Sequence, residues 1–297
     1  MQIIATTMEN TTTTNTNIFQ IDERCKTCFL KTYFRLFEKF AVPEKQQNLF
    51  INFYNEFLTQ NNSLSTPEIQ RHLSIKFSSL VNIVDLFANE KKSCNNIALK
   101  LYDLWKPKIE NSNNPFDLAL RLSIAGNIMD YGANNNFDIN TTINNVLTAN
   151  LAINKTSLLK EKISSAKKIL YLGDNAGEIV FDKLFIQTMK HNNVTYVVKN
   201  APILNDVTIH DAEYVEMSLV ANVISNGYDA PSTILHKSSS EFLNHFYAAD
   251  LIISKGQGNL EGLIHQNDKR IFFLLMVKCD VIAEIIGVNK GDIVVYN

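Results

Sequence analysis

The first 125 residues of the chain contain no glycine. All 10 glycines of the 297-residue sequence lie at or after Gly126. Glycine is the residue that readily adopts the positive φ angles of tight turns, so the first part of the chain has no residue suited to such turns. We therefore expect this part to be mostly helical.

Long apolar runs and a surplus of positive charge are also absent. The longest purely apolar run, residues 271–277, is too short to span a bilayer and is typical of a buried strand. The formal net charge is −2, which provides no general cationic surplus for binding nucleic-acid phosphates. We expect a protein that binds neither membranes nor nucleic acids.

Cysteine is scarce and a secretory signal is missing. Residues 1–17 have no basic residue before a short apolar patch and no long apolar stretch, so we interpret them as a disordered tail. This predicts a cytoplasmic protein in which the four cysteines are reduced thiols. Three of them leave two alternatives open: inert thiols, or a second metal or redox site at Cys25, Cys28 and Cys279. A structural Zn²⁺ site would need a fourth ligand there.

Residues 18–165 have helical patterns. Apolar side chains recur at helical spacing in residues 45–60, and Thr66 with Pro67 predicts a helix N-cap and first-turn proline. Pro107 predicts that a third helix stops near Trp105, and a fourth helix is expected to begin at Pro115 and to end at Gly132. The aromatic residues of this region are interpreted as core.

The pattern changes after residue 165. From residue 166 to 297, short runs rich in β-branched residues alternate with helical segments. This alternation predicts an α/β fold: a three-layer α/β/α sandwich with a mostly parallel, Rossmann-like sheet, which follows the helical N-terminal region. In such a fold the chemistry lies beyond the carboxyl ends of the strands.

Polar residues follow three of the predicted strands. In a parallel sheet these loops share one edge, so the three groups are expected to converge. Their carboxylate and amide oxygens are ligands for Mg²⁺ or Mn²⁺ rather than Zn²⁺. The three groups are Asp174, Asn175, Gly177 and Glu178; Lys199, Asn200, Asn205 and Asp206; and Lys255, Gly256, Gly258, Asn259 and Glu261.

Lys255 and the GQG that follows it add a cation and a helix N-terminus, a combination suited to phosphate. Each part also has a structural interpretation. Asp174 and Asn175 are good helix caps, and GQGN is a common turn composition. The order of a Walker A loop is missing. Co-location at three strand ends favours a binding site.

Six segments of the sequence share one resemblance: LGDNAGE (172–178), APILNDVT (201–208), DLIISKGQGNLE (250–261), AGNIMDYG (125–132), CKTC (25–28) and KCDVIAEIIGV (278–288). They resemble the metal-dependent damage-control phosphatases, a family formerly catalogued as domain of unknown function 89. The resemblance covers nearly the whole chain after the N-terminal tail. CKTC and KCDVIAEIIGV resemble the archaeal and bacterial branch in particular.

The resemblance implies a divalent metal, Mn²⁺, Mg²⁺, Co²⁺ or Ni²⁺, and hydrolysis of phosphomonoesters of small, often damaged, metabolites such as sugar phosphates. It implies Asp174, Asn175 and Asp206 as metal ligands. Lys255, with Gly256 and Asn259 beside it, would hold the phosphate. Asn127 and Asp130 would line the pocket from the helical side. Where relatives are expected to have arginine and glycine, this chain has Lys199 and Asn200.

The expected mechanism has a metal-activated water attacking the phosphoryl group while Lys255 neutralises the developing charge. Asp174 or Asp206 acting as a nucleophile is the alternative, and Glu178 is either a first-turn helix residue or a base that orients water. Two other functions stay open. One is a non-catalytic protein that binds a phosphorylated metabolite. The other is an S-adenosylmethionine-dependent methyltransferase, which the lack of repeated glycines in LGDNAGE disfavours.

Overall fold

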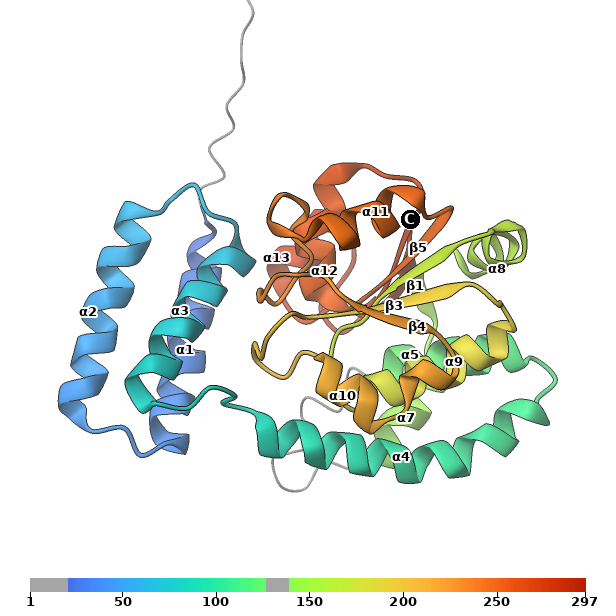
Figure 1. Ribbon diagram of the computed structural model, residues 1–297, viewed down its shortest axis with the longest axis horizontal. Helices are drawn as coiled ribbons and strands as arrows, with labels where there is room; N and C mark the ends of the chain where they lie inside the picture. Colours follow the sequence, from blue (N-terminus) through green and yellow to red (C-terminus); the bar gives the residue numbers. More distant parts are fainter. Residues whose placement is uncertain (1–20, 127–138) are drawn as a thin grey trace, which may run out of the picture.

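The computed structural model describes residues 21–126 and 139–297. Within these residues, a seven-stranded sheet lies between two layers of helices, and three further helices form a separate group beside it (Figure 1). The predicted α/β fold with a mostly parallel sheet covered on both faces is confirmed. In the described residues, no helix is both long and apolar enough to cross a membrane.

The first three helices form a small bundle with its own core. They are α1 (Glu23–Lys39), α2 (Glu44–Gln60) and α3 (Thr66–Val81). Tyr33, Phe37, Phe50 and Phe77 are buried between them, with ring centroids 4.5–5.8 Å apart. Because this core extends only over residues 21–87, the bundle is a distinct lobe, which we call the N-terminal lobe.

The sheet has the strand order β1-β7-β6-β5-β2-β3-β4, and all neighbours are parallel except β6 and β7. Alternate residues of the strands point into two cores, one on each face. The strands are β1 (Leu151–Asn154), β2 (Ile169–Leu172), β3 (Val194–Val198), β4 (Asn222–Ser225), β5 (Leu251–Lys255), β6 (Ile271–Met276) and β7 (Ile293–Tyr296).

Helices from both halves of the sequence cover the two faces. The larger layer holds α4 (Ala88–Glu110), α5 (Pro115–Ala125), α7 (Ile139–Thr148), α8 (Thr156–Ser165), α9 (Glu178–Met189) and α10 (Ile209–Tyr214). The opposite layer holds α11 (Ser240–Ala248), α12 (Gly256–Leu263) and α13 (Asp280–Ile286). Short 3-10 helices lie at Met217–Leu219, Leu235–Lys237 and Ile264–Gln266.

The structure differs from the sequence-based expectation at the domain division. The helices after residue 87 pack on the sheet rather than on the N-terminal lobe, so the cores divide near residue 87 instead of residue 165. Residues 151–154, expected in the helical region, form the edge strand β1. With four residues, this strand is too short to show a clear alternation in the sequence.

Two helix boundaries also differ. The N-cap of α3 is Ser65 rather than Thr66, because Glu68 completes a capping box with Ser65. Helix α4 continues through Pro107 to Glu110 instead of stopping near Trp105. Trp105 and Ile109 are both buried in the larger core, and their burial holds the last turn in place despite the proline. The expected terminator Gly132 and the expected tail, residues 1–17, lie outside the described residues.

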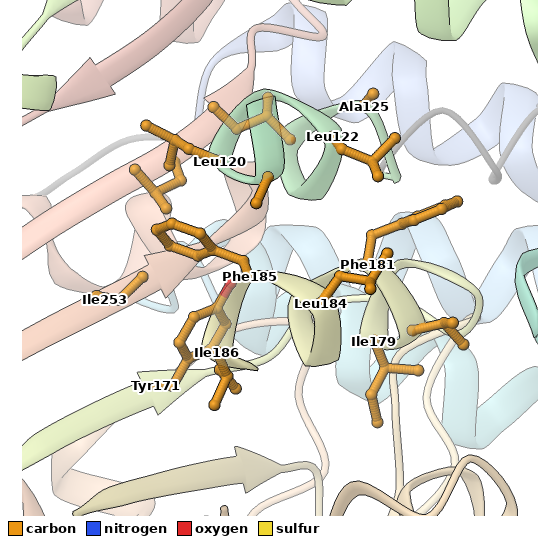
Figure 2. Packing of buried hydrophobic residues seen from close by; sticks show 14 of the residues in the cluster. Leu120, Leu122, Ala125, Tyr171, Ile179, Phe181, Leu184, Phe185, Ile186 and Ile253 are labelled. Atoms are coloured by element: carbon orange, nitrogen blue, oxygen red, sulfur yellow. The ribbon is translucent and has the colours of Figure 1, made fainter. Parts of the chain in front are cut away.

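Helix α9 is the centre of the larger layer. It packs between α5 and the sheet, and Figure 2 shows Phe185 of α9 between Leu120 of α5 and the strand residue Ile253. All of these side chains are buried, and Phe185 also meets the ring of Phe116 edge-on at 5.4 Å. The packing fixes the position of the first turn of α9, where the polar residues begin.

Phe185→Ala should therefore destabilise the fold by about 3–5 kcal/mol, the usual cost of removing a fully buried phenylalanine. Urea denaturation followed by circular dichroism measures the effect. Leu219→Ala, at a side chain that is 73% exposed, is the control and should change the free energy of unfolding by about 0.5 kcal/mol or less. If the free energy of unfolding falls equally in the two variants, the packing of Phe185 between α5 and the sheet does not have the importance assigned to it.

Candidate active site

The sheet has one switch point, between the neighbouring strands β2 and β5. From β2 the chain continues to β3 and β4 on one side, and from β5 it continues to β6 on the other. The loops after β2 and β5 therefore diverge to opposite faces and leave a crevice at the carboxyl ends of the strands. The polar groups predicted from the sequence lie here.

The structure brings the three predicted metal ligands together. Asn175 and Asp206 face each other in an isolated antiparallel β-bridge. The backbone N–H of Val207 donates to the carbonyl oxygen of Asp174 over 2.9 Å, and that of Ala176 donates to Asn205 over 3.0 Å. The residues Asp174, Asn175 and Asp206 are 7%, 4% and 3% exposed. Backbone pairing between the loops after β2 and β3 thus fixes a buried group of oxygen atoms.

Gly256 follows β5 at the point where the backbone comes close to the side chain of Asp174, and only glycine fits there. Its φ is +75°, a conformation that favours glycine, and a Cβ added there would lie 1.8 Å from Asp174 Oδ2. Any side chain at this position would displace the carboxylate. The sequence analysis gave Gly256 a phosphate contact, which stays a prediction; the structure shows its close approach to Asp174.

Lys255 has a different position from the one expected. Its side chain is fully buried, and its ammonium donates to Glu178 Oε1 over 2.5 Å, to Asp182 Oδ1 over 2.7 Å and to the carbonyl oxygen of Ser123 over 2.9 Å. These three acceptors use all three ammonium protons. The expected contact between Lys255 and a phosphate is therefore not supported by the geometry. Burial by itself lowers the pKa of Lys255, but the neighbouring Asp182 and Glu178 raise it above its ordinary value.

A buried carboxylate that the sequence analysis missed completes this arrangement. Asp182 accepts hydrogen bonds from the hydroxyls of Tyr171 and Tyr196 over 2.7 and 2.9 Å, in addition to Lys255. Burial, with Asp182 as a further cause, raises the pKa of both tyrosines well above its usual value, so they are neutral donors. An acid four residues after Glu178 on the same predicted helix was the available signal, since such spacing places both on one helix face.

A second lysine lies closer to the predicted ligands. The ammonium of Lys199 is 3.7 Å from Asp206 Oδ2 and donates to Asn259 Oδ1 over 3.2 Å. Asn259 in turn donates to the carbonyl oxygens of Gly173 and Lys255 over 3.0 and 2.9 Å. Asn259 therefore connects the strand ends instead of facing a substrate. Burial lowers the pKa of Lys199, and the neighbouring Asp206 and Asp174 act against that effect.

The connected side chains carry an excess of negative charge. We define the buried cluster as Asp174, Asn175, Glu178, Asp182, Lys199, Asp206, Lys255 and Asn259. Its four carboxylates and two ammonium groups leave a formal charge of −2 when all are ionised. A buried net charge of this size is costly unless a cation balances it.

We call the three predicted metal ligands, Asp174, Asn175 and Asp206, the ligand group. A cavity of about 710 Å³ opens above them. Its floor includes Asp174, Asn175 and Asp206, and its walls come from α1 and α3 of the N-terminal lobe, from α12 and from the start of α13. The lobe thus contributes to the site even though its core is separate. The cationic side chains that line the cavity are Arg24, Lys31, Lys278 and Lys290.

Cys25, Cys28 and Cys279 line the same cavity as free thiols. Burial, together with the nearby Glu261, raises the pKa of Cys25 to about 11, so this thiol is protonated at neutral pH. In the part of the chain that the structure describes, no three His, Cys, Asp or Glu side chains are arranged as a ready metal site. A second metal or redox site at these cysteines stays a prediction.

Two expected pocket residues, Asn127 and Asp130, lie outside the described residues. The helix that precedes them can be placed. A Cβ at Gly126, after the end of α5, would lie 2.8 Å from the ring of Phe181 and 3.0 Å from the Cα of Glu178. The end of α5 therefore touches the first turn of α9, which begins at Glu178, shortly after Asn175 in the chain.

The comparisons with known proteins agree with this geometry. The damage-control phosphatase ARMT1-like domain matches residues 21–294, which includes the N-terminal lobe and the sheet. The chain belongs to this family. The match spans both walls of the cavity and every described residue of the buried cluster.

Archaeal relatives of this ARMT1-like chain align over most of its length. A damage-control phosphatase of Archaeoglobus fulgidus is 33% identical over 288 residues, 93% of this chain and 98% of that protein. A damage-control phosphatase of Pyrococcus horikoshii is 36% identical over 214 residues, 71% and 74% of the two chains. A protein of Methanocaldococcus jannaschii without an assigned function is 40% identical over 222 residues, 70% and 72% of the two chains.

A solved structure has the same fold as this ARMT1-like chain. The crystal structure of a DUF89 family protein from Pyrococcus horikoshii superposes with a TM-score of 0.83 at 30% identity, and covers 93% of this chain and 98% of that one. The assignment to the branch with the CxxC motif is not tested by these matches and stays a prediction.

The place of Lys255 gives a stability prediction. Lys255→Met should destabilise the fold by about 3–5 kcal/mol at neutral pH, because it leaves two buried carboxylates without their ammonium. The raised pKa means that the lysine's contribution is fully present below its ordinary value of 10.5 and is lost only as the pH rises through the raised value. Urea denaturation at neutral pH measures the loss.

Lys183→Met is the matched control, since Lys183 is a buried lysine on α9, the helix that carries Glu178 and Asp182, and its ammonium donates to the carbonyl oxygen of Val215 over 2.8 Å. Its loss should be smaller, about 1–3 kcal/mol, because only one carbonyl loses its donor. If the control is as unstable as Lys255→Met, the buried ion pairs do not have the importance assigned to them.

Proposed function

We propose that this protein is a divalent-metal-dependent phosphatase that hydrolyses phosphomonoesters of small metabolites. The observation that supports the proposal most is the buried cluster: its residues Asp174, Asn175 and Asp206 present oxygen atoms at the floor of a cavity of about 710 Å³, and the cluster as a whole has a formal charge of −2. The names of the relatives from Archaeoglobus fulgidus and Pyrococcus horikoshii, damage-control phosphatases, support the same activity.

The residues present fit a hard divalent cation. Asp174 and Asp206 offer carboxylate oxygens and Asn175 an amide oxygen, the donor types that Mg²⁺ and Mn²⁺ prefer. Two carboxylates and one amide leave further coordination positions for water and substrate oxygens, as is usual for Mg²⁺ sites. A divalent ion would also balance the formal charge of the cluster. When bound, it would supply Lewis acidity toward a phosphoryl oxygen and water.

The chain's own groups can hold the phosphate beside these ligands. Gln257 and Gly258, in the first turn of α12, line the cavity together with Asp174 and Asn175. The N-cap residue of this helix, Lys255, makes no side-chain hydrogen bond to its first N–H groups, and the N-terminus of a helix favours an anion. We assign the phosphate to this position instead of to the ammonium of Lys255.

The remaining groups act on the ligands and not on the substrate. Lys199 lies on the inner side of Asp206, where it holds that carboxylate in place and reduces the repulsion between Asp206 and Asp174. Gly256 gives Asp174 room to point at the site. Lys31, Lys278 and Lys290 along the cavity favour an anionic substrate, whereas Arg24 is paired with Asp22 and Glu284.

A screen of purified protein against phosphorylated metabolites, sugar phosphates included, tests the proposal. The screen is run with Mn²⁺, Mg²⁺, Co²⁺ or Ni²⁺ and with a chelator. We expect phosphate release that needs a divalent ion. Tight binding of a phosphorylated metabolite without turnover under any of these metals would contradict a phosphatase and indicate a binding protein.

A variant tests the ligand assignment. Asp174→Ala should abolish metal-dependent phosphate release while it changes the fold little, because Asp174 lies at the rim of the sheet. Asp280→Asn, which removes a carboxylate from the same cavity but not from the ligand group, should keep the activity. Phosphate release and circular dichroism are measured for both. An Asp174→Ala protein with parental activity and Mn²⁺ affinity would refute the assignment.

A further inference from the structure

The side-chain amide of Asn175 has a defined orientation in the structure. Its Nδ2 donates to Asp174 Oδ2 over 2.8 Å and approaches Glu178 Oε2 at 3.5 Å. Ionised carboxylates only accept hydrogen bonds, so the NH₂ end of the amide must face both of them. The carbonyl oxygen, which is the only end of the amide that can bind a metal, is therefore turned away from both Glu178 Oε2 and Asp174 Oδ2.

Glu178 is held in turn by Lys255. Glu178 Oε1 accepts from the Lys255 ammonium over 2.5 Å, while the other oxygen, Oε2, is the one that faces Asn175. Both side chains are buried, so no water competes for these contacts. The two oxygens of one carboxylate thus connect the ammonium at the end of β5 with the amide after β2.

Lys255 is itself fixed from the opposite side. Asp182 and the carbonyl oxygen of Ser123 take its remaining protons, and two tyrosine hydroxyls hold Asp182. The contacts thus run from α5 through Lys255 and Glu178 to Asn175, and the contact between Glu178 and Asn175 is the longest of them at 3.5 Å. Together with Asp174, Glu178 faces the NH₂ end of the Asn175 amide.

We propose that Glu178, held by Lys255, is a positioning residue that fixes which end of the Asn175 amide is presented to the divalent ion and so sets the affinity for that ion. This inference rests on the proposed function, since it concerns the same metal site. It gives Glu178 a role different from that of a base acting on water, and it gives Lys255 a role that needs no contact with phosphate.

The experiment uses the full chain and Mn²⁺ as the probe, with affinity measured by isothermal titration calorimetry and by the electron paramagnetic resonance signal of free Mn²⁺. Glu178→Gln keeps the shape of the side chain but brings an NH₂ group within reach of the Asn175 amide. We expect the Mn²⁺ affinity to fall about 10- to 100-fold, the usual effect of losing a residue that orients a metal ligand.

The same change in the Asn175→Asp background separates positioning from simple electrostatics. An aspartate has two equivalent oxygens and needs no orientation. Adding Glu178→Gln to Asn175→Asp should therefore lower the Mn²⁺ affinity by less than about 3-fold. A loss in this background as large as in the parental chain would show that only the charge of Glu178 matters, and would overturn the positioning role.

Two further outcomes are distinguishable. If the parental chain binds Mn²⁺ and releases phosphate but Glu178→Gln binds Mn²⁺ equally well, the positioning role is wrong and the proposed function stands. If the parental chain neither binds Mn²⁺ nor releases phosphate from any substrate, the proposed function fails and this inference fails with it. Lys183→Met, a buried lysine change outside the cluster, is the control and should leave the Mn²⁺ affinity unchanged.

Discussion

The buried ammonium of Lys255 is the interaction on which the rest of the site depends. It ends the central strand β5 and joins two carboxylates of α9 to a backbone carbonyl of α5. Two carboxylates could not lie side by side in the core without it, since each buried charge needs a partner. The first turn of α9, the loop after β2 and the end of α5 are therefore held in one arrangement.

From this arrangement the geometry of the site follows. The switch point between β2 and β5 opens a crevice, and backbone pairing of the loops after β2 and β3 brings Asp174, Asn175 and Asp206 together. Gly256 lets the loop after β5 approach Asp174 closely. The N-terminal lobe, which has its own core, adds a wall of the cavity. A rigid buried layer thus supports a polar rim, while a separate lobe shapes the space above it.

Much of this could be predicted from the sequence because the signals are local. Short β-branched runs, the polar groups that follow them and the absence of early glycines predicted the α/β fold and the convergence of Asp174, Asn175 and Asp206. The direction of Lys255 could not be predicted, because a lysine at a strand end faces either the rim or the core depending on which helix packs beneath it. Here Asp182 on α9 accepts a hydrogen bond from the Lys255 ammonium, which therefore faces the core. The edge strand β1 was not predicted because its four residues are too few to show a periodic pattern.

The proposed function requires that Asp174, Asn175 and Asp206 hold a divalent ion. Anomalous diffraction at the manganese absorption edge, from crystals soaked in Mn²⁺ and inorganic phosphate, is the most direct test. We expect a peak within roughly 2.0–2.6 Å of oxygen atoms of these three side chains, the range for hard divalent cations, with the phosphate at the first turn of α12. A peak only at Cys25, Cys28 and Cys279, or no peak in crystals of protein that releases phosphate, would contradict it.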